Sequence, residues 1–466
     1  MTGFWSSAKL AQARVHDARS GWVTGESLTA LADAAVAGLP GRSLFLLRFA
    51  SNVASVATYL GALRHGHVPL LVGPDLAPTM FEPMCHRFGL QRTFDGTTGT
   101  WANVPGNTCQ APALHPALAL LLPTSGSTGS PKLVRLSYEN LASNAASIAS
   151  YLDLGPGETA ITSLPLSYSF GLSVLNSHLS SAGSIVLSDA AVTTKAFWEL
   201  FRAQGVTSLA GVPTTWRMLR QMRFERMELP TLHYMTQAGG RLEPEEIAWL
   251  GSLAKRTGRR VFIMYGQTEA TARISFLPPE LILEKPGSIG RAIPGGELWL
   301  ADEGGASVAE PGVQGQLMYR GPNVMLGYAE SVADLALGQQ SGVLATGDLA
   351  RVDQDGHFWI TGRLKRFVKL FGNRFGLDEV EQHLHSLGVE AAAVGRDDAL
   401  MIGVVGSRDE ATALQRRLAD HYRVHFSAVQ VFAVPELPRN GAGKLLYGEL
   451  QELLDRLAIS SAGESP

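Results

Sequence analysis

The feature that most restricts the fold of this chain is the alternation of short apolar runs with longer segments of helical period, from about Gly41 to Gly287. Apolar runs of about four to eight residues are typical of buried strands, and apolar residues at helical spacing indicate helices packed on a core. Where the two alternate, a parallel or mixed sheet covered by helices is expected. The sequence therefore predicts the α/β class. The expected strands are 43–49, 68–72, 117–122, 184–187 and 208–212, and the expected helices are 52–63, 194–204 and 214–222.

The texture of the sequence changes after Gly287. Alternating, turn-rich segments such as 296–301, 315–319 and 357–360 predict a β-rich subdomain over about 288–361. Strand and helix patterns resume beyond Gly362 over roughly 100 residues, enough for a small domain. We therefore expect a large N-terminal domain of helix-covered sheets, residues 1–363, and a small mobile α+β C-terminal domain, residues 364–466.

Charge balance and cysteine count exclude several classes of protein. Lys plus Arg number 39 and Asp plus Glu number 42, so the net charge of −3 gives no bulk attraction to nucleic acid or anionic membrane. Cys85 and Cys109 are the only cysteines, and their spacing fits neither a zinc-ligand pair nor a Cys-x-x-Cys redox site. The N-terminus lacks an apolar signal segment, and no run of about 18 apolar residues occurs. A cytoplasmic protein without a membrane span and without a nucleic-acid partner is expected.

The strongest chemical signal is a segment rich in glycine and hydroxyl groups that directly follows the apolar run 117–122. Glycines let backbone N–H groups close around an anion, hydroxyls add donors and Lys132 adds positive charge, which together suit a polyphosphate. The lysine position excludes a Walker A loop, in which Gly-Lys is followed by Ser or Thr. A flexible Gly/Ser linker is the weaker alternative, because a strand adjoins the segment. The predicted phosphate-binding residues are Thr124, Ser125, Gly126, Ser127, Thr128, Gly129 and Lys132.

This segment resembles the phosphate loop of the adenylate-forming (AMP-binding) superfamily, which comprises acyl-CoA synthetases, nonribosomal adenylation domains and luciferases. Further motifs follow in the family's order. The run 265–269 resembles the segment whose tyrosine stacks on adenine and whose threonine meets the α-phosphate, and the turn 238–240 resembles the adenine-contacting turn. The residues that this resemblance assigns to the nucleotide are Ala238, Gly239, Gly240, Tyr265, Gly266 and Thr268.

The resemblance also implies ATP and Mg²⁺, with Glu269 and Thr128 as metal-binding residues. Magnesium on ATP prefers carboxylate and phosphate oxygens, which supports Glu269 independently, although a lone glutamate is as often a solvated surface acid. Asp348 resembles the aspartate that accepts both ribose hydroxyls, since a carboxylate has two acceptor oxygens. Arg363 resembles the arginine near the ribose and phosphate; the alternative for it is a surface ion pair.

The segment 363–381 resembles the family's hinge, with Lys365 at the hinge position and Lys369 on the face presented in the second half-reaction. The loop 438–444 resembles the one that carries the catalytic lysine, here Lys444. The implied mechanism is attack of a carboxylate on the α-phosphate, loss of pyrophosphate, rotation about Lys365 and transfer of the acyl group to a thiol. The enzyme is thus expected to be an ATP-dependent, AMP-forming acid–thiol ligase. The expected catalytic residues are Lys444, Lys369, Thr268 and Glu269.

The segment 164–173 resembles the border of the family's acyl pocket, with Tyr168 and Phe170 as pocket residues. Plain core packing is the alternative interpretation for both aromatics. Amino-acid-activating relatives place an aspartate in this stretch, but no acidic residue occurs from Leu164 to Leu187, so a substrate ammonium would lack a partner there. We therefore expect a carboxylic acid without an α-amino group.

The thiol acceptor stays open between two candidates. The segment 390–405 is shorter than in relatives whose loop at this point helps to bind the CoA nucleotide. CoA is the slight favourite, and the phosphopantetheine of an acyl carrier protein is the alternative. Two other functions compete: an amino-acid adenylation enzyme that loads a carrier protein, and a nucleotide-binding protein without turnover. The joint presence of Lys132, Glu269, Asp348 and Lys444 argues against the second of these, and nothing in the sequence specifies the oxygen chemistry of a luciferase.

Overall fold

The computed structural model describes residues 3–105, 112–123, 132–364, 366–370, 373–396, 399–422, 424–439 and 445–462. The chain forms two compact units. Unit 1 contains most of the chain up to Leu298 together with Tyr319–Leu344, and unit 2 contains Trp299–Met318 and the chain from Ala345 onward. The predicted division at residues 363 and 364 stays a prediction. Among the described helices, none has both the length and the apolar character needed to cross a bilayer.

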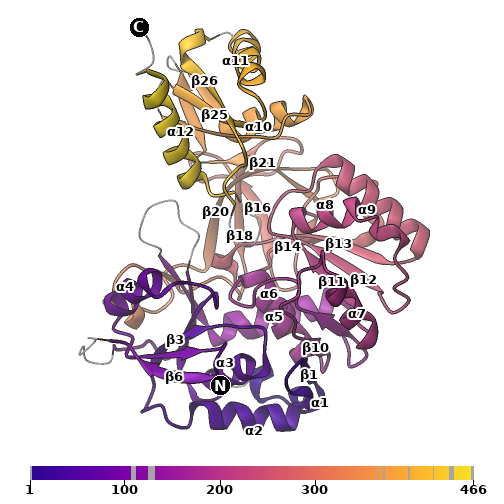
Figure 1. Ribbon diagram of the computed structural model, residues 1–466, viewed down its shortest axis with the longest axis vertical. Helices are drawn as coiled ribbons and strands as arrows, with labels where there is room; N and C mark the ends of the chain where they lie inside the picture. Colours follow the sequence, from indigo (N-terminus) through magenta and orange to yellow (C-terminus); the bar gives the residue numbers. More distant parts are fainter. Residues whose placement is uncertain are drawn as a thin grey trace. The chain divides into compact units, whose positions relative to one another are not determined.

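Two large sheets form unit 1 (Figure 1). The first has the strand order β19-β8-β7-β4-β3-β5-β6, with β5, β3, β4 and β7 parallel. The second has the order β15-β14-β13-β12-β11-β9-β10-β1-β2, and it is parallel from β13 to β1. Strands of the first sheet are β3 (Leu44–Arg48), β4 (Val68–Val72), β5 (Arg92–Asp95), β6 (Thr100–Asn103), β7 (Leu118–Pro123), β8 (Leu133–Ser137) and β19 (Gly327–Ala329). Strands of the second are β1 (Arg14–Asp17), β2 (Gly21–Thr24), β9 (Thr159–Ile161), β10 (Ser184–Val186), β11 (Ser208–Gly211), β12 (Tyr234–Gln237), β13 (Arg260–Tyr265), β14 (Ser275–Leu277) and β15 (Arg291–Ala292).

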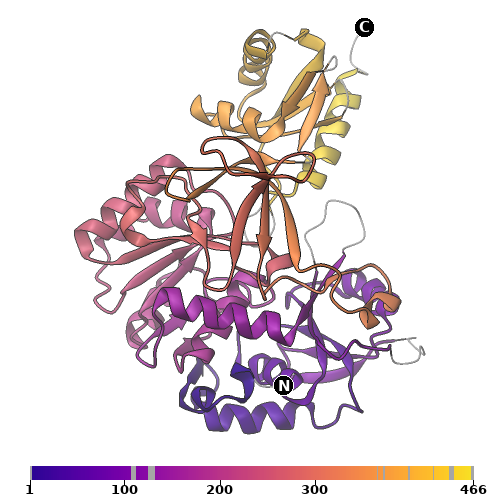
Figure 2. The same cartoon turned by 180° about the vertical axis from the view of Figure 1, so that it is seen from behind.

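Helices cover both faces of these sheets because successive strand residues point to opposite sides. In β13, Val261 and Ile263 pack with α7, α8 and α9, whereas Phe262 and Met264 face α5 and α6. Helices α5 and α6 lie side by side (Figures 1 and 2), and both also contribute leucines to the core of the first sheet. The helices of unit 1 are α1 (Ala8–Gln12), α2 (Gly25–Val36), α3 (Val53–His65), α4 (Pro78–Phe88), α5 (Tyr138–Leu152), α6 (Ser169–Ser180), α7 (Lys195–Ala203), α8 (Pro213–Gln221) and α9 (Pro244–Thr257).

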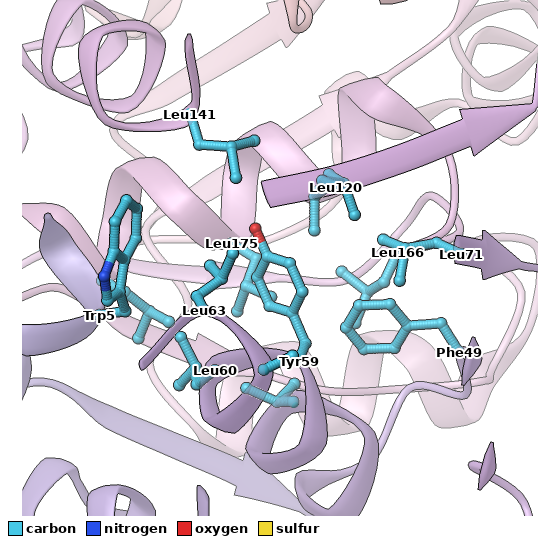
Figure 3. Packing of buried hydrophobic residues seen from close by; sticks show 14 of the residues in the cluster. Trp5, Phe49, Tyr59, Leu60, Leu63, Leu71, Leu120, Leu141, Leu166 and Leu175 are labelled. Carbon is cyan, nitrogen blue, oxygen red and sulfur yellow. The ribbon is translucent and has the colours of Figure 1, made fainter. Parts of the chain in front are cut away.

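Leucine is the most frequent residue in the core between the first sheet and its helices, and Tyr59 is fully buried in it. Figure 3 shows Tyr59 of α3 among leucines of several elements, with Trp5 and Phe49 on either side. The Tyr59 hydroxyl donates a hydrogen bond to Asn176 Oδ1 at 3.2 Å, so its polar atom is satisfied inside the core. Burial raises the pKa of Tyr59, so it stays protonated.

Unit 2 combines a β-rich sheet with a small α+β segment. The sheet, seen from behind in Figure 2, has the order β17-β16-β18-β20-β21, and residues at one end of β16, β18 and β20 belong to unit 1. In the C-terminal segment, α10 and α11 pack on one face of the sheet β24-β25-β26 and α12 on the other. These arrangements confirm the predicted α/β class with helix-covered sheets. The elements are β16 (Glu297–Ala301), β17 (Ser307–Val308), β18 (Gly315–Arg320), β20 (Val343–Val352), β21 (Phe358–Arg363), β22 (Phe367–Leu370), β23 (Asn373–Gly376), α10 (Leu377–Ser386), β24 (Ala391–Arg396), β25 (Ala399–Val405), α11 (Arg408–Tyr422), β26 (Val429–Val434) and α12 (Tyr447–Ala462).

Candidate active site

The loop after β13 is a tight reversal that fixes three of the residues predicted to form the site. Gly266 lies so close to the chain that a Cβ atom there would stand 1.7 Å from the Ala272 carbonyl oxygen, so only glycine fits. A short 3₁₀ turn, η3 (Thr268–Ala270), follows at once, and Thr271 takes a left-handed φ of 64°. Tyr265, Thr268 and Glu269 therefore project from one compact turn at the carboxyl end of a parallel strand.

Glu269 is held by a side chain from the other sheet. Its Oε1 accepts a hydrogen bond of 2.7 Å from the hydroxyl of Tyr328, which lies in β19. Burial, and next the adjacent Glu269 carboxylate, raise the pKa of Tyr328, so this hydroxyl stays protonated and donates. The contact fixes one carboxylate oxygen of the residue predicted to bind magnesium.

Lys132 lies near the same tyrosine. Residue 133 begins β8, which pairs antiparallel with β19. The ammonium of Lys132 lies 5.8 Å from the centre of the Tyr328 ring and forms an ion pair with Glu330. Lys132 and Glu269, which are far apart in sequence, are thus both in contact with Tyr328. The other predicted phosphate-loop residues, Thr124, Ser125, Gly126, Ser127, Thr128 and Gly129, lie outside the described residues.

The turn 238–240 follows β12 and packs on Tyr168. Gly239 has a φ of +81°, and a Cβ atom there would stand 2.7 Å from the Tyr168 hydroxyl oxygen and 3.1 Å from Val212 Cγ1. The side-chain amide of Gln237 donates a hydrogen bond of 2.7 Å to the Gly240 carbonyl oxygen, which closes the turn. Ala238 is buried. A glycine at 239 is therefore required both by conformation and by space.

Tyr168 and Phe170 lie at the beginning of α6, at the border of a cavity within unit 1. Phe170 lines this cavity, whereas Tyr168 packs beside it with ring centres 6.4 Å apart. Between them, Ser169 Oγ accepts a hydrogen bond of 3.3 Å from Thr268 Oγ1. The start of α6 thus connects the turn after β13 with the cavity. Both aromatics also belong to or pack against a buried cluster, so the core-packing interpretation holds beside the pocket one.

Asp348 and Arg363 form a pair within unit 2. They are opposite each other in the register of β20 and β21, and Arg363 Nε lies 3.1 Å from Asp348 Oδ1. The Asp348 side chain is buried, and its backbone N–H donates to the Thr346 hydroxyl at 3.1 Å. Arg363 therefore forms an ion pair, as its alternative interpretation expected, and the partner is Asp348, the predicted ribose-binding aspartate.

The lysines predicted for the hinge and for catalysis are described least. Lys365 and Lys444 lie outside the described residues. Lys369 lies in β22, where its backbone pairs with Arg374, and its side chain is not among those described. Their roles stay predictions.

Sequence reasoning missed three residues that contact the predicted ones: Tyr328, Ser169 and Arg273. Tyr328 is 59 residues from Glu269, and no local pattern connects the two. Arg273 carried a signal, because it is a charged residue in the otherwise uncharged run 270–279 that follows Glu269 directly. It is 2% exposed.

Comparison with known proteins gives the following similarities. The family model for "AMP-binding enzyme" matches residues 92–329, slightly more than half of the chain. A feruloyl-CoA synthase of an Amycolatopsis species is 32% identical over 351 residues, which cover 72% of this chain and 69% of that protein. The 2-succinylbenzoate–CoA ligase of Bacillus subtilis is 29% identical over 348 residues, covering 72% of this chain and 69% of that protein. Among solved structures, the B. subtilis O-succinylbenzoate CoA synthetase in complex with AMP has a TM-score of 0.78 at 23% identity, covering 97% of this chain and 98% of that one.

Proposed function

Because the chain belongs to the family of AMP-binding enzymes, we propose that it is an ATP-dependent, AMP-forming ligase that joins a carboxylic acid to the thiol of CoA. The family match confirms the resemblance inferred from the motifs, and the two relatives described above are a CoA synthase and a CoA ligase. The observation that carries the proposal is this match together with the ordered motifs from residue 124 to residue 444.

In the first half-reaction, a carboxylate oxygen of the acid attacks the α-phosphorus of ATP, the bond to the bridging oxygen breaks and pyrophosphate leaves. Tyr265 stacks on the adenine, the turn 238–240 borders it, and Thr268 donates to the α-phosphate. Asp348 accepts from the ribose hydroxyls, with Arg363 beside it. Lys444 holds the two reacting anions together and offsets the charge that develops between them.

In the second half-reaction, the thiol sulfur attacks the acyl carbon of the adenylate, the carbon–oxygen bond to AMP breaks and the thiol proton is released. Rotation of the C-terminal segment about Lys365 replaces Lys444 by the face that carries Lys369. One site thereby runs two reactions in sequence.

The described residues fit a magnesium ion. Glu269 offers a carboxylate whose Oε1 is fixed by Tyr328, and Mg²⁺ prefers such hard oxygens together with phosphate oxygens. Glu269, with Thr128, would hold the ion, which would neutralise charge on the phosphates. Lys132, which also lies near Tyr328, adds a positive charge for the phosphates; its ammonium forms an ion pair with Glu330.

CoA is the proposed acceptor, and a carrier-protein phosphopantetheine stays the alternative. The strands β24 and β25 pair up to Arg396 and Ala399, so only residues 397–398 connect them. This short connection is the feature that favours a search for a carrier protein. We further propose that the acid has no α-amino group, because none of the described residues that line the cavity is acidic. A cytoplasmic location is proposed from the low cysteine count; the thiol of Cys85 is buried.

ATP–pyrophosphate exchange with pooled fatty, aryl, short hydroxy and amino acids tests the proposal, with CoA and a phosphopantetheinylated carrier protein then added to each active pool. Exchange with an acid and discharge of the adenylate by CoA are the expected results. Lys444→Ala should abolish exchange, whereas Lys369→Ala should spare exchange and slow thioester formation. Equal loss of both steps in both variants would refute the proposed alternation, and ATP binding without exchange in any pool would refute the ligase.

A further inference from the structure

The side chain of Arg273 is a buried charge without a strong acceptor. It is 2% exposed, and its Cζ atom lies 4.0 Å above the centre of the Phe170 ring. Its Nε contacts the Met264 sulfur at 3.4 Å, and Nη1 contacts the Ala272 carbonyl oxygen at 3.4 Å. A thioether is a weak acceptor, and the carbonyl contact is long. In the described part of the chain, the groups that interact with its charge are the hydroxyls of Tyr151 and Tyr168, not a carboxylate.

Arg135 shows how this chain satisfies a buried arginine when the role is structural. Arg135 is also fully buried. Its guanidinium donates to backbone carbonyls of Leu326, Tyr328, Leu337 and Gly338, so it ties a loop to β8. Five donors on a guanidinium require such partners, and Arg273 has nothing comparable.

Arg273 lines the cavity between α5, α6 and the strands β9, β11, β12 and β13. The space in this cavity that water molecules can occupy is about 20 Å³, and the empty space among its lining atoms is about 340 Å³ when open solvent is included. In the part of the chain that the structure describes, no acidic residue lines it. His178, which also lines it, is neutral, because burial lowers its pKa to about 4; its Nδ1 bonds to the Val174 carbonyl at 2.8 Å. Arg273 is thus the one charged group among the residues placed around this cavity.

The cavity also adjoins the proposed reaction centre. Ser169 accepts from Thr268, the residue proposed to meet the α-phosphate, and the next residue, Phe170, lies beneath Arg273. A substrate whose reacting carboxylate lies near Thr268 therefore extends toward a guanidinium. Burial lowers the pKa of Arg273, but a guanidinium stays protonated in proteins, so the charge persists. A charge buried in this way requires a counter-charge, and a carboxylate matches its forked donors.

We propose that the acid activated by this protein is a dicarboxylic acid, and that Arg273 binds the carboxylate that does not react. This inference rests on the proposed ligase function and specifies its substrate class. The hydroxyls of Ser173, Ser177 and Tyr234, which also line the cavity, give further polar contacts for the linker between the two acid groups.

The test is ATP–pyrophosphate exchange with matched sets of three compounds: a diacid, the monoacid of the same carbon skeleton and the half-amide of the diacid. Suitable sets are succinate, butyrate and succinamate; adipate, hexanoate and adipamate; and isophthalate, 3-methylbenzoate and 3-carbamoylbenzoate. For the best set we expect kcat/KM for the diacid to exceed that for the monoacid and the half-amide by roughly 100-fold or more, because a site built for one polar group rejects analogues that lack it.

Arg273→Met removes the charge and keeps an unbranched side chain. We expect it to lower kcat/KM for the diacid about 100-fold, mainly through KM, and to leave the monoacid unchanged or improved. Arg273→Lys, which keeps the charge without the fork, should fall between wild type and Arg273→Met. Arg260→Met is the matched control, because Arg260 of β13 also lies over aromatic rings, those of Tyr234 and Phe262, but does not line the cavity. Thermal unfolding and ATP binding of each variant report its folding.

The outcomes separate the two proposals. Monoacids that react as well as diacids in the wild-type enzyme would overturn the dicarboxylate inference and leave the ligase function intact, whether or not any variant folds. Equal losses with monoacid and diacid in Arg273→Met would also overturn it, since Arg273 would then hold the reacting carboxylate. Exchange with no acid of any set or pool would overturn the ligase function, and the inference with it.

Discussion

The contact between Tyr328 and Glu269 predicts that the variant Tyr328→Phe will weaken the response to magnesium. The substitution removes one hydroxyl, and the phenylalanine ring fills the same space. It deletes a hydrogen bond of 2.7 Å to a carboxylate oxygen, and hydrogen bonds to charged groups contribute about 1.5–3 kcal/mol. At 1.4 kcal/mol per factor of ten, this corresponds to an increase of roughly 10- to 100-fold in the free Mg²⁺ needed for half-maximal exchange, the range typical of residues that orient metal ligands.

The assay is pyrophosphate exchange titrated with free Mg²⁺ at saturating ATP and acid. Tyr447→Phe is the matched control, because it removes a hydroxyl from a carboxylate in the C-terminal segment, where Tyr447 donates to Glu381 at 3.2 Å. We expect the control to keep the wild-type half-saturation. If Tyr328→Phe leaves the Mg²⁺ response unchanged, Glu269 is not oriented through this contact. If less Mg²⁺ is needed, the hydroxyl competes with the metal for the carboxylate, and the reasoning is refuted.

Three further predictions address conformation, stability and pH. Gly239→Ala should reduce adenylation, and because of the left-handed φ alone it should lower the free energy of unfolding, measured with urea, by about 1–2 kcal/mol. Adding Tyr168→Phe should relieve the clash with the Tyr168 hydroxyl but not the strain of the backbone. Glu381→Gln should destabilise the C-terminal segment by roughly 3 kcal/mol, because Glu381 accepts hydrogen bonds from Arg366, the Ala393 N–H and Tyr447. Hydrogen exchange of the amides in β24–β26 measures this loss, and unchanged protection would refute the prediction. Asp17 is buried, which raises its pKa, but hydrogen bonds from the N–H groups of Val53, Ser20 and Arg19 outweigh this and leave the pKa lowered. The stabilisation is therefore present above about pH 4 and lost as pH falls through the folded-state pKa, so Asp17→Asn should cost about 1–3 kcal/mol at pH 7 and progressively less below pH 4. A cost that is independent of pH would contradict this assignment.

The sequence predicted the layered fold well because its signals are local. The expected strand 68–72 is β4 to the residue, and the expected helix 194–204 is α7 within one residue at each end. The strand β4 is a continuous apolar run, and α7 has apolar residues at helical spacing. The helix α7 is also preceded by Thr194, whose hydroxyl accepts a hydrogen bond from the first turn of the helix. The β-rich texture after Gly287 likewise corresponds to β16, β18 and β21.

The site was predicted less completely, since motif residues are contiguous and their partners are not. The turns 265–269 and 238–240 could be recognised from the sequence because each requires a glycine at a particular position, Gly266 in the first and Gly239 in the second. Tyr328 reaches Glu269 only because β19 adds to the edge of the first sheet beside β8, a pairing between segments about 190 residues apart. The shortage of acceptors around Arg273 is likewise a property of packing, which a linear pattern does not contain.

The pairing of β7 with β8 also affects the entropic cost of the nucleotide binding proposed for the segment 124–132. Pro123 and Leu133 are paired across these two strands, so the ends of the intervening segment 124–132 are held together by the sheet. Closing a free loop of this length costs about 2 kcal/mol of chain entropy by the logarithmic relation. Because the sheet already brings Pro123 and Leu133 together when the protein folds, the proposed binding of a polyphosphate does not include this entropic cost. Substitutions within 124–132 should consequently change ligand affinity while leaving global unfolding almost unaffected.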